Sequence, residues 1–200
     1  MIRAGFTFEH PITKTRTVVL EAAAETGGMG WLLEVTRYSA SGSDLGEHLH
    51  QTWTETFEII KGTAKYSLDG NERTVKAVES FMVEPGHFHI HPWNADEEEL
   101  VYRQRSRFDR PNPAAIQDIL GIFATRTGMI RDGIRLKGLA KVLVQSATIR
   151  TATRHGNYVA QPSIAAQKMI SSTLGLLGEL LGYRAVQAKY VGDYGFPMES

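Results

Sequence analysis

The hydrophobic and polar positions of this 200-residue chain follow two different periods, with a change near residue 110. Before that point, short segments rich in β-branched and aromatic residues are separated by turn-forming pairs such as Asp69-Gly70. Such segments are typical of strands, because these side chains pack well on a pleated surface. The predicted strands are 15–20, 30–38, 55–60, 63–68, 73–76, 80–83 and 100–107. Many short strands without helices between them predict an antiparallel sandwich or barrel.

After Arg110 the apolar positions recur at the spacing of an α-helix. Asn112 and Pro113 have the residue types of an N-cap and a first helical position, and a helix is predicted from there to about residue 128. Two more helices are predicted over 136–150 and 162–181. Their apolar stripes need a cover, which the outside of the barrel or a second copy of the chain would provide. The chain is therefore predicted to contain a mainly β part, residues 1–110, and a helical C-terminal extension, residues 111–200.

The last predicted helix carries glycines at positions 175, 178 and 182, where a neighbouring backbone could approach closely. Its few cations do not favour a helix that lies on a membrane surface. We expect this segment to pack within the chain or in a homodimer.

Composition removes several classes of protein and of chemistry. A hydrophobic content of 42% with 22% charged residues is typical of a globular protein and not of a disordered one. Without cysteine the chain has no disulfide, no thiolate nucleophile and no cysteine-held zinc or iron–sulfur site. Any metal would need His, Asp or Glu ligands. Because the apolar runs are short, we expect neither a membrane span nor a secretion signal, and we expect a cytoplasmic protein.

The zero net charge conceals an uneven distribution. Residues 1–100 contain 8 basic and 16 acidic side chains, a net charge of −8, whereas residues 101–200 contain 14 and 6, a net charge of +8. This pattern favours an acidic part and a basic part that dock on each other or on a symmetry mate. The basic residues are spread along the chain without a compact cluster, so nucleic acid is not an expected partner.

Histidines are concentrated in two short windows. The windows are His48/His50 and His87/His89/His91. Side chains repeat at every second residue of a strand, so each window places its imidazoles on one face. If the two strands meet inside one barrel, both sets point to a common centre. Neutral imidazoles with one carboxylate are suitable ligands for a divalent Fe, Mn, Ni, Cu or Zn ion.

Gly42, His48, His50, Glu55 and Gly62 are spaced G-x5-H-x-H-x4-E-x6-G. This spacing resembles the first motif of the cupin superfamily at all of its fixed positions. The resemblance implies a cupin double-stranded β-helix, a small jelly-roll-like barrel. It also implies that His48, His50 and Glu55 are metal ligands.

The stretch EPGHFHIHPWN around the second window is similar to the second cupin motif, P-x-G-x-x-H-x-x-x-N, with two departures. Glu84 replaces the proline, and Asn94 comes one residue late. Counting from the glycine selects His89 as the fourth ligand. Because a shift of two residues preserves the strand face, His87 and His91 remain alternative ligands.

The resemblance covers residues 32–107 and implies a metal-dependent function. Three histidines and one glutamate would leave positions on the metal open for water, dioxygen or substrate. We expect an enzyme that acts on a small oxygenated or acidic organic molecule, of the dioxygenase, isomerase or decarboxylase type. The metal-bound water or dioxygen is then the reactive group, because no separate nucleophile or base stands out. The alternatives are a non-catalytic small-molecule binding or sensing module, and a metal-free barrel in which these side chains only form hydrogen bonds.

Three residues near the ligand windows are candidates for the substrate pocket. Phe57 and Trp93 could line it, although aromatic residues in strands usually belong to the core. Arg103 could bind a substrate carboxylate if its side chain pointed into the barrel. It alternates with Arg105 and Arg107, a pattern that favours the solvent-facing side of a strand.

Overall fold

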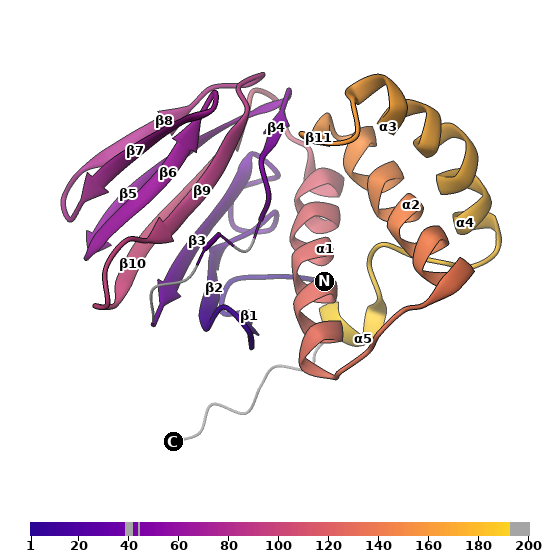
Figure 1. The fold of residues 1–200 in the computed structure, drawn as a ribbon, viewed down its shortest axis with the longest axis horizontal. Coiled ribbons are helices and arrows are strands. Elements are labelled where there is room, and N and C mark those ends of the chain that lie inside the picture. The colour runs from indigo at the N-terminus through magenta and orange to yellow at the C-terminus, as the bar shows by residue number, and fades with distance from the viewer. Residues whose placement is uncertain (39–41, 44, 193–200) are drawn as a thin grey trace.

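The structure is a computed structural model that describes residues 1–38, 42–43 and 45–192. In these residues two antiparallel sheets and a set of C-terminal helices form the fold (Figure 1). The first sheet has the order β1 (Thr7–His10), β2 (Thr15–Glu21), β3 (Gly30–Arg37), β10 (Leu100–Phe108), β5 (Trp53–Lys61) and β8 (Ser80–Val83). The second has the order β11 (Asn157–Val159), β4 (His48–His50), β9 (His89–Asn94), β6 (Thr63–Leu68) and β7 (Asn71–Lys76). The predicted mainly β class with C-terminal helices is confirmed.

Period-two alternation decides which side chains enter the space between the sheets. Along β10, Tyr102, Gln104 and Ser106 are buried and alternate with exposed arginines. The neighbouring strand β5 buries Glu55 and Phe57 in the same way. Because β10 and β5 pair with Ser106 opposite Glu55, several buried polar groups lie together inside an otherwise apolar core.

The helix α1 (Pro113–Arg131) lies between the sheets and the remaining helices (Figure 1). The Asn112 side chain accepts a hydrogen bond from the backbone N–H of Ala115 at 3.1 Å, as expected of an N-cap. Ile116 and Leu120 are fully buried and belong to the same core as the barrel side chains. The helix therefore forms one wall of the β part.

A second layer of helices packs beyond α1. It consists of α2 (Gly138–Arg154), α3 (Ile164–Ile170), the π-helical segment η1 (Ser171–Gly175) and α4 (Leu176–Leu180), with the short α5 (Ala188–Val191) next to α1. A Cβ atom on Gly175 would lie 2.7 Å from the carbonyl oxygen of Ser146, and one on Gly178 would lie 2.9 Å from that of Leu143. The close backbone approach expected of these glycines therefore occurs within the chain, between α2 and the segment η1–α4.

The helical part also contains one strand, which pairs with a strand of the β part. Strand β11 follows α2 and pairs with β4, with Asn157 opposite His50 and Val159 opposite His48. The division at residue 110 stays a prediction, since segments on both sides of it share a sheet and a core. None of the described helices has the length and apolarity needed to cross a membrane.

Candidate metal centre

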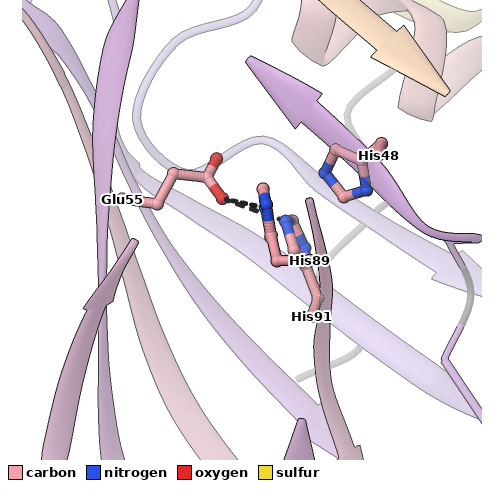
Figure 2. A group of neighbouring side chains, drawn as sticks. All are labelled: His48, Glu55, His89 and His91. Atoms are coloured by element: carbon pink, nitrogen blue, oxygen red, sulfur yellow. Dashed lines mark hydrogen bonds and ion pairs between the residues drawn. The ribbon is translucent and has the colours of Figure 1, made fainter. Parts of the chain in front are cut away.

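Strand pairing brings the two histidine windows together. Strands β4 and β9 are antiparallel neighbours, and His48 lies directly opposite His89. Glu55 enters from β5 of the other sheet. His48, Glu55, His89 and His91 are all buried, and each offers a ligand atom within 4.8 Å of the others (Figure 2). Residues far apart in the chain thus form one compact group between the sheets.

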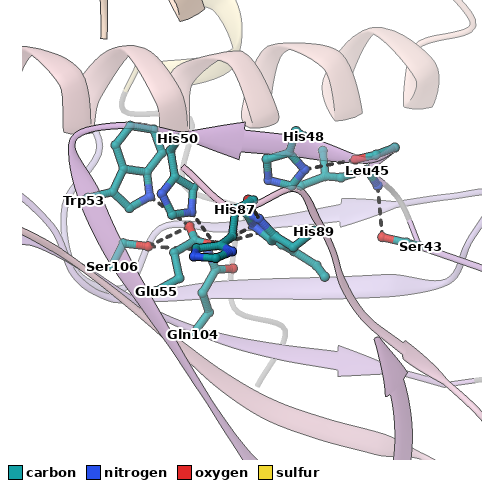
Figure 3. Close-up of polar contacts among 12 residues, drawn as sticks. Ser43, Leu45, His48, His50, Trp53, Glu55, His87, His89, Gln104 and Ser106 are labelled. Atoms are coloured by element: carbon teal, nitrogen blue, oxygen red, sulfur yellow. Dashed lines mark hydrogen bonds and ion pairs between the residues drawn. The ribbon is translucent and has the colours of Figure 1, made fainter. Parts of the chain in front are cut away.

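Glu55 is held in place through one of its carboxylate oxygens. Its Oε1 accepts hydrogen bonds from Trp53 Nε1 at 3.0 Å, Gln104 Nε2 at 2.9 Å and Ser106 Oγ at 3.0 Å (Figure 3). All four residues are buried. Three donors saturate Oε1 and fix the plane of the carboxylate, which leaves Oε2 to face the histidines.

The second oxygen of Glu55 is surrounded by imidazole nitrogens. Its Oε2 lies 3.0 Å from His91 Nε2, 3.3 Å from His89 Nε2 and 3.4 Å from His50 Nε2. Metal–ligand bonds of about 2.1 Å separate adjacent ligand atoms by about 3.0 Å in an octahedron and about 3.4 Å in a tetrahedron. The donor spacing therefore fits a first-row divalent ion.

Two of the histidines are oriented by backbone carbonyls. The ring nitrogen Nδ1 of His48 lies 2.9 Å from the carbonyl oxygen of Gly46, and that of His89 lies 3.1 Å from the carbonyl oxygen of His87. A carbonyl oxygen only accepts hydrogen bonds, so Nδ1 is the donor in both rings. In the neutral rings Nε2 then carries the lone pair. Such outer hydrogen bonds are typical of histidines that bind metals.

The electrostatic environment favours the metal-binding forms of most of these groups. Burial lowers the pKa of the His48 imidazole well below its usual value, and it also lowers the pKa of His91. Burial by itself would raise the pKa of Glu55, but the adjacent His50 and His91 rings outweigh it and hold that pKa well below its usual value. Neutral imidazole and ionised carboxylate are the forms that bind metal ions.

His89 differs from its neighbours. Burial acts to lower its pKa, but its hydrogen bond to Glu55 and the charge of that carboxylate outweigh burial, so the pKa of His89 is raised. Since Nδ1 already donates to a carbonyl, Nε2 can donate to Glu55 only when the ring is an imidazolium. A metal ion between Nε2 and the carboxylate would replace that proton.

The environment of His50 indicates whether the group suits a bound metal ion. Both of its ring nitrogens are buried and make no hydrogen bond among the described residues, since Glu55 Oε2, 3.4 Å from Nε2, is in ion-pair range only. The ring stacks on Trp53 with centroids 4.4 Å apart. A buried polar group without a partner costs about 1–3 kcal/mol. A metal ion at the group would satisfy His50 Nε2, so the side chains present suit a divalent cation.

Of the four predicted ligands, His48, Glu55 and His89 lie in this buried group, and His50 lies beside it with its Nε2 3.4 Å from Glu55 Oε2. Among the alternatives, His91 belongs to it as well. His87 does not: its side chain is half exposed and pairs with Asp69 at 2.7 Å. The structure thus brings four histidines to Glu55, and the choice of ligands among them stays a prediction.

The sequence interpretation missed the three groups that hold Glu55. Gln104 and Ser106 occupy positions between the arginines of the strand that is now β10, on its opposite face. Polar residues at inward positions of a barrel strand are unusual, and this signal could have marked them. For Trp53 no comparable signal exists, because an aromatic residue in a strand is ordinary.

A cavity of about 70 Å³ adjoins the group. Its described lining residues are Phe8, His10, Thr15, Thr17, Leu33, Val35, Arg37, Ser43, Leu45, His91, Tyr102, Gln104, Phe123, Arg126 and Thr127. His91 and Gln104 connect it to Glu55. Helix α1 supplies its last three lining residues, so the helical part closes one side.

The three residues expected in a substrate pocket are not among these described lining residues. Phe57 is fully buried in the core, where its ring contacts those of Phe81 and His91. Trp93 is partly buried against the same core. Arg103 is exposed and binds Glu34 at 3.2 Å, because the alternation of β10 turns the arginines to the outer face. The inward orientation considered for Arg103 therefore disagrees with the structure.

Comparison with known proteins agrees with this fold and site. Residues 35–102 match the family model described as a cupin domain. Residues 35–102 thus form a cupin domain, and the metal-ligand group lies within this matched segment. Helices α1 to α5 lie beyond the matched segment. No curated protein matches the chain.

Several solved structures are similar to about half of this chain. A predicted oxalate decarboxylase from Thermotoga maritima is 17% identical with a TM-score of 0.43. The match covers 47% of this chain and 80% of the chain of that protein. The cupin domain of Cnp3 from Schizosaccharomyces pombe is 13% identical with a TM-score of 0.42, covering 48% and 65%. The cupin domain of an XRE-family transcriptional regulator from Enterobacter cloacae is 13% identical with a TM-score of 0.42, covering 48% and 98%.

Proposed function

We propose that this protein is a metal-dependent enzyme that acts on a small oxygenated or acidic organic molecule in the cavity beside the histidine–glutamate group. The observation that carries the proposal is the environment of Glu55. Its Oε1 is saturated by three donors, and its Oε2 faces three imidazole nitrogens at 3.0–3.4 Å. Such a group is costly to bury without an ion and well arranged to bind one.

The ligands proposed for one divalent ion are His48, His50, Glu55 and His89, with His91 as the alternative histidine. A donor set of imidazole nitrogens and one carboxylate oxygen suits Fe, Mn, Ni, Cu or Zn. When bound, such an ion polarises a substrate oxygen or lowers the pKa of a water ligand. Isomerase and decarboxylase chemistry can use these properties, whereas dioxygenase chemistry would also require a redox-active ion such as Fe.

The chain itself contributes orientation and exclusion of water. Trp53, Gln104 and Ser106 hold Glu55 in one position, and backbone carbonyls orient His48 and His89. The aromatic ring of Phe57 packs against that of His91 with centroids 5.0 Å apart. A rigid, partly apolar surrounding limits the number of geometries that the ligands can adopt, which favours selective binding of the ion.

Metal analysis of matched variants tests the proposal. His89→Ala removes a buried ligand, whereas His87→Ala changes an exposed residue of the same window. We expect native protein and His87→Ala to retain about one metal ion per chain, and His89→Ala to lose at least about tenfold in affinity. Elemental analysis after dialysis, with competition by a chelator, measures both.

Equal metal retention by His87→Ala and His89→Ala would contradict the assignment. A panel of small hydroxy acids, keto acids and phenols then tests turnover, with oxygen uptake and product formation as readouts. A protein that retains its metal and binds members of the panel without converting them would instead be a binding or sensing module.

A further inference from the structure

The cavity is lined by residues inside and outside the segment that matches the cupin domain. His91 and Gln104 on one side belong to the segments around the metal-ligand group, whereas Phe123, Arg126 and Thr127 on the other side belong to α1. Helix α1 begins after the end of the cupin match at residue 102. The binding site is therefore completed by a segment outside the cupin domain.

Building on the proposed function, we propose that Arg126 binds the carboxylate of a small organic acid that lies in this cavity and reaches the metal-ligand group. Arginine is suited to this role because its planar guanidinium donates two parallel hydrogen bonds to a carboxylate. The acid would thus be held at one end by the helical extension and at the other by the metal centre.

Arg126 lines the cavity, and its charge environment differs from that of several other arginines of the chain. Arg103, Arg105 and Arg150 each bind a glutamate carboxylate within 3.2 Å. Arg126 is exposed, and the described residues give it neither an ion pair nor a hydrogen bond. No Asp or Glu is among the described residues that line the cavity. An incoming carboxylate would therefore meet an available guanidinium without a competing acidic side chain from those residues.

The remaining walls suit the same ligand. The hydroxyl groups of Thr17 and Thr127 can donate hydrogen bonds to carboxylate or hydroxyl oxygens, while Leu33, Val35 and Phe123 provide apolar surface. Apolar walls exclude water and strengthen the attraction between opposite charges. A volume of about 70 Å³ corresponds to about five water sites and hence to an acid of about five non-hydrogen atoms.

Glycolate and its uncharged amide, glycolamide, provide a matched pair of probes of this size. Ligand-observed NMR titrations are carried out on Zn²⁺-loaded and on metal-free protein, for the native chain, Arg126→Ala, Arg126→Lys and Arg103→Ala. We expect Arg126→Ala to raise the Kd for glycolate at least about tenfold, and Arg126→Lys to raise it less, since the charge remains without the guanidinium fork. Glycolamide should show no such dependence.

Arg103→Ala is the matched control, because it also removes an exposed arginine but one that points away from the cavity. It should leave the Kd for glycolate within about twofold of the native value. No saturable glycolate binding by the native protein, or a Kd for Arg126→Ala within about twofold of native, would overturn the proposal. Circular dichroism verifies that each variant is folded.

Zinc content, measured in parallel, separates this proposal from the proposed function. Metal retention without any effect of Arg126→Ala would overturn the carboxylate site and leave the metal centre intact. Loss of glycolate binding by Arg126→Ala in a protein that binds no metal would support the carboxylate site and contradict the metal-dependent function.

Discussion

At the scale of single residues, Glu55 determines the character of the centre. One oxygen is saturated by Trp53, Gln104 and Ser106, and the other is left to a set of imidazoles. A carboxylate free to rotate would divide its hydrogen bonds between both oxygens. The three donors on Oε1 prevent this, so the side chain presents one oriented oxygen, a property that a metal ligand requires.

The histidine pKa shifts predict how the stability of the metal-free protein depends on pH. The pKa values of His48 and His91 are lower in the folded protein than in the unfolded chain. Below about pH 6.5 these two histidines are therefore protonated in the unfolded chain but stay neutral in the folded protein. Their effect reduces stability as the pH falls. The raised pKa of His89 acts in the opposite sense, stabilising the fold below about pH 6.5 and ceasing to do so as the pH rises through its folded value.

Because the pKa of His48 is lowered well below its usual value, its effect should exceed that of His89, and we expect a lower free energy of unfolding at about pH 5.5 than at about pH 7.5. Urea denaturation of metal-free protein at both pH values measures it. His48→Asn, which removes the group with the strongly lowered pKa, should lose less stability over the same interval. A native stability that stays constant or increases on acidification would contradict this interpretation.

At the scale of secondary-structure elements, the helical layer depends on close contact between α2 and the segment η1–α4. Gly175 is the tightest point, because a Cβ atom there would lie 2.7 Å from the carbonyl oxygen of Ser146 and 2.7 Å from Cβ of Arg150. Arg150 also binds Glu179 at 2.8 Å across the same contact. The absence of a side chain at residue 175 thus determines how closely the helices approach.

Gly175→Ala tests this contact. Alanine is the better helix former by about 1 kcal/mol, but forcing a methyl group into a filled space costs about 1–3 kcal/mol. We expect net destabilisation, because one of the obstructing atoms is a backbone oxygen that cannot rotate away. Thermal and urea unfolding measure the change, with Ser172→Ala as the control, since Ser172 is an exposed polar residue of the same segment. A Gly175→Ala variant more stable than the native protein would refute the close-packing argument.

At the scale of the whole molecule, apolar side chains remain uncovered on the outer face of α3 and α4. Met169, Leu176, Leu177 and Leu180 are between 39% and 76% exposed, opposite the glycines that face α2. Exposed apolar side chains gathered on one segment are typical of interaction surfaces, and we expect one here. The charges of −8 and +8 on the two halves of the sequence favour a second copy of the chain as the occupant, because each half complements the other.

We therefore expect the native protein to form a homodimer that Leu176→Glu dissociates. Sedimentation velocity over a range of concentrations measures the oligomeric state. Val78→Glu is the control, because Val78 is 94% exposed on the β part, away from this surface. A native monomer, or a dimer that persists in Leu176→Glu, would contradict the expectation.

Much of the β part and of the metal centre was predictable from the sequence, for a local reason. The alternation of side chains along a strand and the two-residue spacing of the histidines depend only on the geometry of adjacent residues. They indicated the mainly β class, the main strands and the shared face of the histidines in each window, whereas Glu55 and His89 were selected as ligands by the resemblance to the cupin motifs. The strands β1 and β11 were not predicted, because segments of four and three residues show little periodicity of their own.

The tertiary structure alone decided which distant residues meet. The sequence left His87 and His91 as equal alternatives, and only the pairing of β9 places His91 beside Glu55 while His87 lies at the surface. It likewise placed Arg126 rather than Arg103 at the cavity, because α1 packs against the β part and β10 turns its arginines outward. Local periodicity specifies the face of a strand, whereas packing between elements specifies what that face meets.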